Sequence, residues 1–218
     1  MSESARAEIL AGVRRALGGG ATVEPPQPVA TASAGGGPGA APLVERFCER
    51  ARDYRAGVSS VSADAVAGEI ASIAARHGAR RLLLAPGLPA EWRPAELELV
   101  EDDGRLAARE IEQFDGALTG ASAAAAQTGT LALAHGPGQG RRALTLLPDL
   151  HICIVPASRI VSDIPEAIAM LEPIVRGERR PVTLVSGPSA TSDIELRRVE
   201  GVHGPRKLEV VVVDEPAS

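Results

Sequence analysis

A chain of 218 residues is long enough for one substantial domain, or for one domain with an appendage. Its net charge of −5 excludes a sequence-independent grip on nucleic acid, which needs Lys and Arg clustered against phosphates. Aromatic residues make up only 2% of the chain, so its core must consist of Leu, Val, Ile and Ala, and this favours stacked helices and strands.

The chain begins with an expected amphipathic helix over residues 1–17, whose apolar residues share one face. Gly, Pro, Ala, Ser and Thr dominate residues 18–42, and such a composition predicts a flexible linker. A helix on a tether can dock on a partner or on a second copy, so a homodimer is one expectation and a frayed terminus is the alternative. The remaining residues, 43–214, are expected to form the globular domain.

From residue 43 onward, helical spacing alternates with short aliphatic runs. This alternation predicts an α/β fold with a mixed, mostly parallel sheet and helices on both faces. The expected helices are Leu43–Tyr54, Ser62–His77, a segment ending at Ile111, Ala121–Ala126, Ile164–Val175 and a segment starting at Asp193; the expected strands are Arg81–Ala85, Leu97–Glu101, Gly116–Leu118, Thr130–Ala134, His151–Val155, Val182–Val185 and Leu208–Val213.

The two cysteines, Cys48 and Cys153, are too far apart in the sequence for a CxxC unit. Neither a disulfide framework nor a thiolate-bound zinc or iron–sulfur site is therefore expected. Cys153 lies in an apolar run and is expected to be a buried, inert thiol. The chain has no run of 18 apolar residues and no basic-then-apolar start, so we expect no membrane span and a cytoplasmic location.

Ligands of open α/β sheets bind at the carboxyl ends of strands, so loops rich in small residues are the candidate sites. In Gln127–Thr130, Gly129 allows close backbone approach while the hydroxyls of Thr128 and Thr130 flank exposed amides. That pattern suits a carboxylate or a phosphate, and it equally suits a plain turn.

The loop Gly136–Arg142 is only superficially like a dinucleotide-binding loop, because Arg141 stands where the G-x-G-x-x-G spacing needs a small residue. Pro137 also removes one amide that would cradle a phosphate. Arg141 and Arg142 can hold an anion, or they can form a solvated surface pair.

The segment Ser186–Glu195 concentrates more hydroxyls and acids than any other loop. Ser192–Glu195 fits a capping box and predicts a helix start, where Asp193 and Glu195 already use the positive helix end and so disfavour a phosphate. The segment is therefore expected to bind hydroxyl, amine or metal-linked groups, or an anion held upstream by the amides of Gly187–Ser189.

His203 lies in the rigid loop Glu200–Pro205, between Gly-Val and Gly-Pro. A histidine in such an open loop can act as a general base or as a hydrogen-bond donor, and a structural role is the alternative.

In their order and spacing, Thr119-Gly120, Thr128–Thr130, Gly140-Arg141, Ser186–Glu195 and Gly201–Pro205 resemble the LUD domain family over roughly residues 43–214. The resemblance implies a fold similar to that of the sugar-phosphate isomerase and CoA transferase-like superfamily. It also implies a non-redox role in oxidising L-lactate to pyruvate, beside two partner subunits that carry the iron–sulfur chemistry.

The alternative is a stand-alone enzyme, similar to CoA transferases or cyclo-ligases, that acts on an acyl, nucleotide or folate substrate. Gln127 and Ala190 depart from the family pattern, because many members have an acid at the first position and some have Arg at the second. No cofactor and no metal are expected, and the ligand is expected to carry a carboxylate or a phosphate. The expected catalytic residues are Asp193, Glu195 and His203; the expected ligand-binding residues are Thr128, Gly129, Thr130, Arg141, Ser186, Gly187, Ser189, Thr191 and Gly204.

Overall fold

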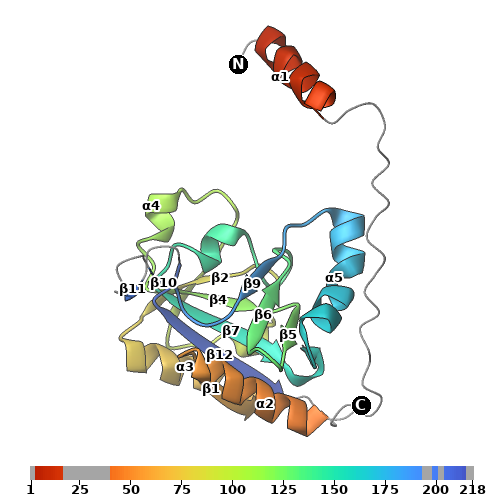
Figure 1. Ribbon diagram of the computed structural model, residues 1–218. Helices are drawn as coiled ribbons and strands as arrows, with labels where there is room; N and C mark the ends of the chain where they lie inside the picture. The colour runs from red at the N-terminus through yellow and green to blue at the C-terminus, as the bar shows by residue number, and fades with distance from the viewer. Residues whose placement is uncertain (1–2, 17–39, 193–197, 201–203, 215–218) are drawn as a thin grey trace. The chain divides into compact units, whose positions relative to one another are not determined.

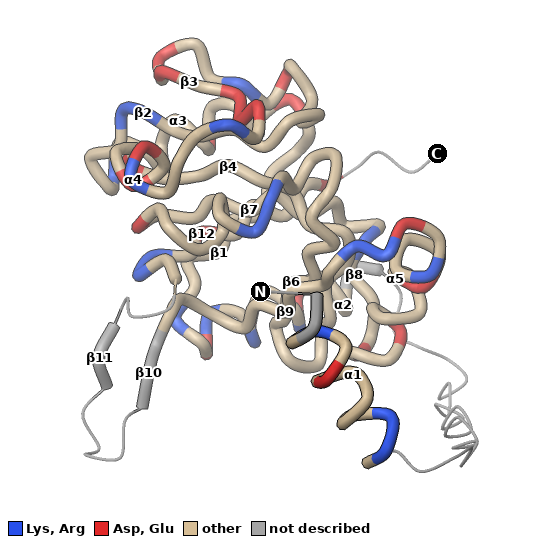
Figure 2. Tube along the Cα trace, turned by 90° about the horizontal axis from the view of Figure 1, so that it is seen from above, with Lys and Arg blue, Asp and Glu red and all other residues tan. Residues whose placement is uncertain are grey.

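The computed structural model describes residues 3–16, 40–192, 198–200 and 204–214, and the chain divides into two compact units, Met1–Gly35 and Gly36–Ser218. In the first unit, α1 (Glu3–Ala16) exposes the side chains of Ile9, Leu10 and Val13. Among the described helices, none combines the length and the apolar character needed to cross a membrane. Over the second unit, Lys and Arg are interspersed with Asp and Glu along the trace (Figure 2).

The second unit is built on a six-stranded parallel sheet (Figure 1). Its strands follow the order β1-β12-β7-β4-β2-β3, and every neighbouring pair is parallel. This confirms the expected α/β fold with a mostly parallel sheet. The strands are β1 (Gly57–Ser62), β2 (Arg81–Leu84), β3 (Glu98–Glu101), β4 (Gly116–Gly120), β7 (Leu150–Pro156) and β12 (Lys207–Asp214).

A second sheet of four strands has the order β8-β5-β6-β9 and contains both parallel and antiparallel pairs. Its strands are β5 (Ala123–Ala125), β6 (Thr130–Leu133), β8 (Ile160–Val161) and β9 (Thr183–Val185). The expectation of a helix over Ala121–Ala126 is therefore wrong. Alanine has the highest intrinsic helix propensity, but tertiary packing overrides it here: all three alanines of β5 are completely buried between two packed layers.

The layers on the two faces of the large sheet follow from the alternation of side chains along its central strands. In β12, Val211 and Val213 pack in the same core as α3 (Val66–His77), whereas Val210 and Val212 pack with α2 (Ala40–Asp53) and the second sheet. Side chains of one strand alternate between the two faces, so a strand covered on both sides is apolar throughout. The outer face of the second sheet packs against α5 (Ile164–Glu178).

The helix boundaries follow sequence signals. Gly78 has φ +67° and donates its amide to the last turn of α3, as its position after His77 predicts. Asp163 caps α5 by accepting a hydrogen bond from the amide of Glu166 at 3.0 Å. The helix expected to end at Ile111 is the single turn α4 (Ala108–Ile111).

The start of the helix expected from Asp193 lies outside the described residues. Ser192, proposed as its cap, ends strand β10 (Ala190–Ser192), which pairs antiparallel with β11 (Arg198–Glu200). Because Ser192 is paired with Arg198, only residues 193–197 separate the two strands, and these lie outside the described residues.

Candidate functional site

A pocket of about 180 Å³ lies beside the amino ends of β7 and β12, bordered also by β9 of the second sheet. His151 and Leu208 are the second residues of β7 and β12, so the pocket is not at the carboxyl ends where loop residues of such sheets usually bind ligands. We call it the Arg142 pocket. Its lining residues are Arg142, Thr145, His151, Thr183–Ser189, Gly204, Pro205 and Leu208.

Arg142 supplies the positive charge of this pocket. Its guanidinium donates hydrogen bonds to the carbonyl oxygen of Thr145 at 3.0 Å and to the Thr145 hydroxyl at 2.8 Å. It forms no ion pair with a described residue, and the described lining of the pocket contains no Asp or Glu. A guanidinium held by neutral groups keeps its charge available for a ligand anion.

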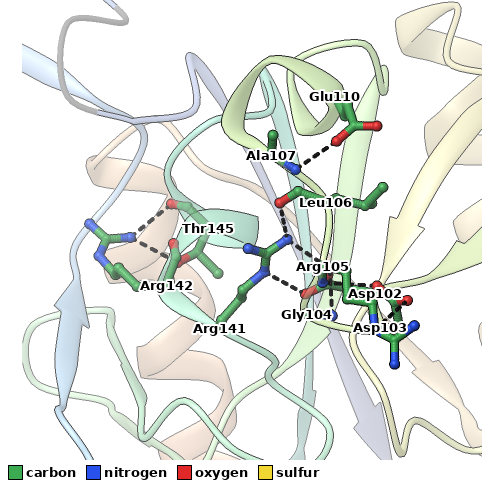
Figure 3. A network of polar contacts seen from close by, with 10 residues as sticks. All are labelled: Asp102, Asp103, Gly104, Arg105, Leu106, Ala107, Glu110, Arg141, Arg142 and Thr145. Carbon is green, nitrogen blue, oxygen red and sulfur yellow. Dashed lines mark hydrogen bonds and ion pairs between the residues drawn. The ribbon is translucent and has the colours of Figure 1, made fainter.

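Arg141 points the other way, and Figure 3 shows the two guanidiniums extending away from each other. Its Nε and Nη2 atoms donate to the two carboxylate oxygens of Asp102 at 2.8 Å and 2.9 Å, and Nη2 also donates to the carbonyl of Leu106 at 2.8 Å. The Asp102 side chain is only 2% exposed. Of the two arginines singled out from the sequence, Arg141 therefore ties a loop to the core while Arg142 lines the pocket.

His151 is buried at the inner end of the pocket. Its Nε2 atom is 2.8 Å from the hydroxyl oxygen of Thr119 on the neighbouring strand β4. Burial lowers the pKa of His151 to about 4, and the positive charge of Arg142 adds to this effect. The imidazole is consequently neutral at pH 7 and can donate or accept one hydrogen bond through each nitrogen according to its tautomer.

Cys153 lies two residues further along β7, where it is paired with Thr119 of β4. It is completely buried, as its apolar surroundings in the sequence predict. Burial raises the pKa of its thiol to about 12, although a hydrogen bond from Thr119 acts in the opposite direction. The thiol is therefore protonated at neutral pH and is a poor nucleophile and metal ligand.

A chain of hydroxyls joins two loops that are far apart in the sequence. The Thr128 and Thr130 hydroxyl oxygens are 2.7 Å apart, and the Thr130 hydroxyl is 2.8 Å from that of Ser186. Ser186 lines the pocket, so the structure brings these three predicted residues together at its rim.

Two glycines let these loops approach the carboxyl-terminal end of α2. Gly129 has φ +61°, and a Cβ atom there would lie 2.5 Å from the backbone nitrogen of Ala51. Gly187 has φ +85°, and a Cβ atom there would lie 2.5 Å from the carbonyl oxygen of Tyr54. Both positions require glycine, because other residues meet backbone strain and backbone atoms. The end of α2 thus sets the position of both loops.

The remaining predicted residues fall into two groups. Ser189 donates its amide to the carbonyl of Pro205 at 2.8 Å, which joins its loop to Gly204 at the pocket. Thr191 is in β10. Asp193, Glu195 and His203 lie outside the described residues.

Reasoning from the sequence did not single out His151, Thr145 or the wall residue Thr183. His151 was hidden inside an apolar strand, and its one signal was a polar residue in an otherwise aliphatic run. The hydroxyl oxygen of Thr183 is hydrogen-bonded to the Nε2 atom of His135, 2.6 Å away. His135 is itself partly buried, which lowers its pKa, so the histidines around this pocket favour their neutral forms.

Comparison with known proteins matches the LUD domain model to residues 44–213. The chain is 42% identical to lactate utilization protein C of Deinococcus radiodurans over 210 residues, which are 96% of this chain and 95% of that protein. It is 36% identical to lactate utilization protein C of Halalkalibacterium halodurans over 116 residues, about half of each chain. The crystal structure of a DUF162 family protein from Deinococcus radiodurans superposes with a TM-score of 0.72 at 38% identity, covering 81% of this chain and 99% of that one.

Proposed function

Since the chain belongs to the LUD domain family and its relatives support a role in lactate utilization, we propose that it is a non-redox subunit of a lactate-oxidising system. In this proposal it binds a small carboxylate in the Arg142 pocket. We further propose that it assembles with iron–sulfur partner subunits, which carry the electrons removed from lactate. The alternative, a stand-alone CoA transferase-like or cyclo-ligase-like enzyme, is an outcome of the same experiments.

The unpaired positive charge of Arg142 is the observation that carries the ligand proposal. A guanidinium recognises a carboxylate through charge-assisted hydrogen bonds, which are shorter and stronger than neutral ones. The neutral His151 and the hydroxyls of Thr145 and Ser186 offer donors and acceptors for a hydroxyl or carbonyl group of the ligand. L-Lactate and pyruvate each combine a carboxylate with one such group.

The size of the pocket favours a small acid over a larger substrate. The Arg142 pocket has a volume of about 180 Å³. A three-carbon acid fits within this space, whereas a nucleotide, a folate or coenzyme A would have to extend out of it. Coenzyme A transfer through a glutamate would also need an acid in the pocket, and none of its described lining residues is one.

The non-redox part of the proposal rests on the cysteines. Cys48 and Cys153 are both buried, and burial raises the pKa of each thiol. Neither therefore offers a thiolate to an iron–sulfur cluster, so in this proposal the clusters belong to the partner subunits.

Calorimetry and thermal unfolding of the purified chain with L-lactate, pyruvate, acyl-CoA and folates test the ligand. A small carboxylate at a hundredfold excess over its Kd adds about 2.7 kcal/mol of stability, which for a chain of this size raises Tm by about 5–10 °C. Arg142→Gln should weaken that binding at least tenfold, whereas Arg105→Gln, on an exposed loop, should leave it unchanged. Binding and turnover of acyl-CoA or a folate would instead establish the alternative.

Assembly is tested separately by co-purification with the iron–sulfur subunits encoded in the same cell and by growth on L-lactate after gene deletion. We expect co-purification and loss of growth. If the subunits do not co-purify and growth on lactate is intact, the assembly proposal is wrong, whatever the outcome of ligand binding.

A further inference from the structure

A second cavity, of about 290 Å³, lies at the carboxyl ends of the central strands of the large sheet. The loops that follow β2 and β6 line it at Gly87 and Gly138, β4 lines it with its last residue, Gly120, and β7 contributes Ile154 and Pro156. We call it the strand-end cavity. Its described lining shares no residue with that of the Arg142 pocket; along β7, Ile154 and Pro156 lie three and five residues beyond His151, which is about 10 Å and 16 Å.

The floor of the strand-end cavity is built by the protein itself. Gly120 donates its amide to the carbonyl of Gly138 at 2.6 Å, and Gly138 donates its own amide to the carbonyl of Pro86 at 2.7 Å. The side-chain oxygen Oε1 of Gln139 accepts hydrogen bonds from the Ser122 hydroxyl at 2.8 Å and from the backbone amide of Ala134 at 2.6 Å. These bonds hold the loops together without a ligand, so binding there does not have to order them first.

The walls are apolar and one of them is aromatic. Trp92, from the turn after β2, lines one side, and Met170 and Ile174 of α5 line another. Indole offers a flat face for an offset or edge-to-face contact with a second ring, and methionine sulfur also contacts aromatic rings favourably. A ligand with a planar ring gains more from these walls than a flexible chain of the same area.

Arg159 supplies the positive charge of the strand-end cavity. It is exposed at the edge of the cavity and forms no hydrogen bond or ion pair with any part of the chain that the structure describes. Among the described residues that line the strand-end cavity, none is Asp or Glu. An anion bound next to Arg159 therefore meets attraction without a competing carboxylate.

We infer that the strand-end cavity is a second ligand site, which binds a compact aromatic anion, a single ring carrying a carboxylate. The ring lies between Trp92 and α5, the carboxylate faces Arg159, and the Ser122–Gln139 pair on the floor meets the polar edge of the ligand. The cavity volume of about 290 Å³ accommodates one ring and its substituents. The site goes beyond the proposed small-acid pocket and stands or falls independently of it.

Trp92 is the only tryptophan of the chain, so its fluorescence reports this cavity directly. The full-length protein is titrated with benzoate, with uncharged benzamide and with cyclohexanecarboxylate, each followed by fluorescence and by calorimetry. We expect saturable binding of benzoate with a change in Trp92 emission. Benzamide should bind at least tenfold more weakly because it lacks the charge, and cyclohexanecarboxylate should bind more weakly because it lacks a planar ring.

Variants assign the binding to one cavity. Arg159→Gln should weaken benzoate at least tenfold and leave benzamide unchanged, whereas Arg176→Gln, an exposed arginine of α5 outside the cavity, serves as the matched control and should change neither. Arg142→Gln should leave benzoate binding intact even if it abolishes binding of lactate or pyruvate. The inference is overturned if benzoate gives no saturable signal by either method, if benzamide binds equally well, or if Arg142→Gln rather than Arg159→Gln removes the binding.

Discussion

At the scale of single residues, His151 makes the stability of the protein depend on pH. Its pKa is about 4 in the folded chain and 6.5 in the unfolded chain. Between these values the unfolded chain takes up a proton that the folded chain does not, so the free energy of unfolding is fully maintained above pH 6.5 and decreases as the pH falls towards 4. The loss attributable to His151 is about 3.5 kcal/mol at most, because each pKa unit corresponds to roughly 1.4 kcal/mol.

Urea unfolding at pH 7, 6 and 5 measures this dependence. His151→Gln should be less stable than the parent at pH 7, but its stability should fall less steeply between pH 6.5 and 5. The other groups that titrate in this range, including His135, are present in both proteins and cancel in the comparison. Parallel pH profiles for the two proteins would show that His151 is protonated normally in the folded state.

The ion pair between Arg141 and Asp102 predicts an asymmetric response to mutation. The Asp102 side chain is 2% exposed while that of Arg141 is 34% exposed. Arg141→Gln leaves a buried carboxylate unpaired and should lower the free energy of unfolding by about 3 kcal/mol, whereas Asp102→Asn leaves a solvated guanidinium and should cost about 1 kcal/mol. Breaking the exposed pair Arg176–Glu172 with Arg176→Gln should cost less than about 0.5 kcal/mol.

Denaturant unfolding of the three variants tests this prediction through the order of their losses in free energy of unfolding. A larger loss for Asp102→Asn than for Arg141→Gln would mean that the carboxylate contributes chiefly through its bond to the amide of Gly104, 3.2 Å away, rather than through the ion pair.

The same pair shows what could be predicted about the site from the sequence. Small and hydroxylated residues singled out the loops carrying Ser186, Gly187, Ser189 and Gly204 in the sequence, and all four residues line the Arg142 pocket. The distinction between Arg141 and Arg142 was not accessible, since it depends on where Asp102 lies, 39 residues earlier in the chain.

At the scale of elements, the all-alanine strand β5 is a consequence of crowding. Ala124 packs towards α2 and the large sheet, and Ala123 and Ala125 pack towards α5. Ala124→Val should therefore destabilise the protein by about 1–3 kcal/mol through overpacking, although valine is the better strand former. Ser60→Val on the exposed side of edge strand β1 serves as the control and should change stability by less than about 0.5 kcal/mol.

Thermal and urea unfolding of both variants test this interpretation. If Ala124→Val is as stable as the parent, then β5 has space around it, and alanine was not selected there by packing.

The comparison of elements also shows where sequence patterns stop being informative. Aliphatic runs located β2, β4, β7 and β12 to within two residues at each end. Strand β1 was missed because its sequence is rich in serine and half exposed, so it has no apolar run to detect. The second sheet was not foreseen as a separate layer, since its existence depends on pairing such as Leu131 with Val185, which local periodicity does not encode.

At the scale of the whole molecule, the Arg142 pocket depends on packing between two sheets. Its walls come from β7 and β12 of one sheet and from β9 of the other, and α2 holds the loops at its rim through contacts with Gly129 and Gly187. Residues 36–218 contain all of these parts as one compact unit. Residues 1–35 form the other unit, so ligand binding and the stability of the sheets are expected to be independent of it.

Removing residues 1–35 tests that independence. Because no sheet residue is lost, the free energy of unfolding should change by less than about 1 kcal/mol, and Tm should change by no more than about 4 °C. Binding of small carboxylates should be retained, since every lining residue of the Arg142 pocket follows residue 141. A truncated chain that unfolds more than 10 °C earlier, or that no longer binds the ligand, would show instead that the amino-terminal unit is part of the folded core.

Light scattering on the same two proteins tests the expected homodimer. The exposed Ile9, Leu10 and Val13 of α1 offer an apolar face for association. The full-length chain should therefore have twice the mass expected for a monomer, and the truncated chain should be monomeric.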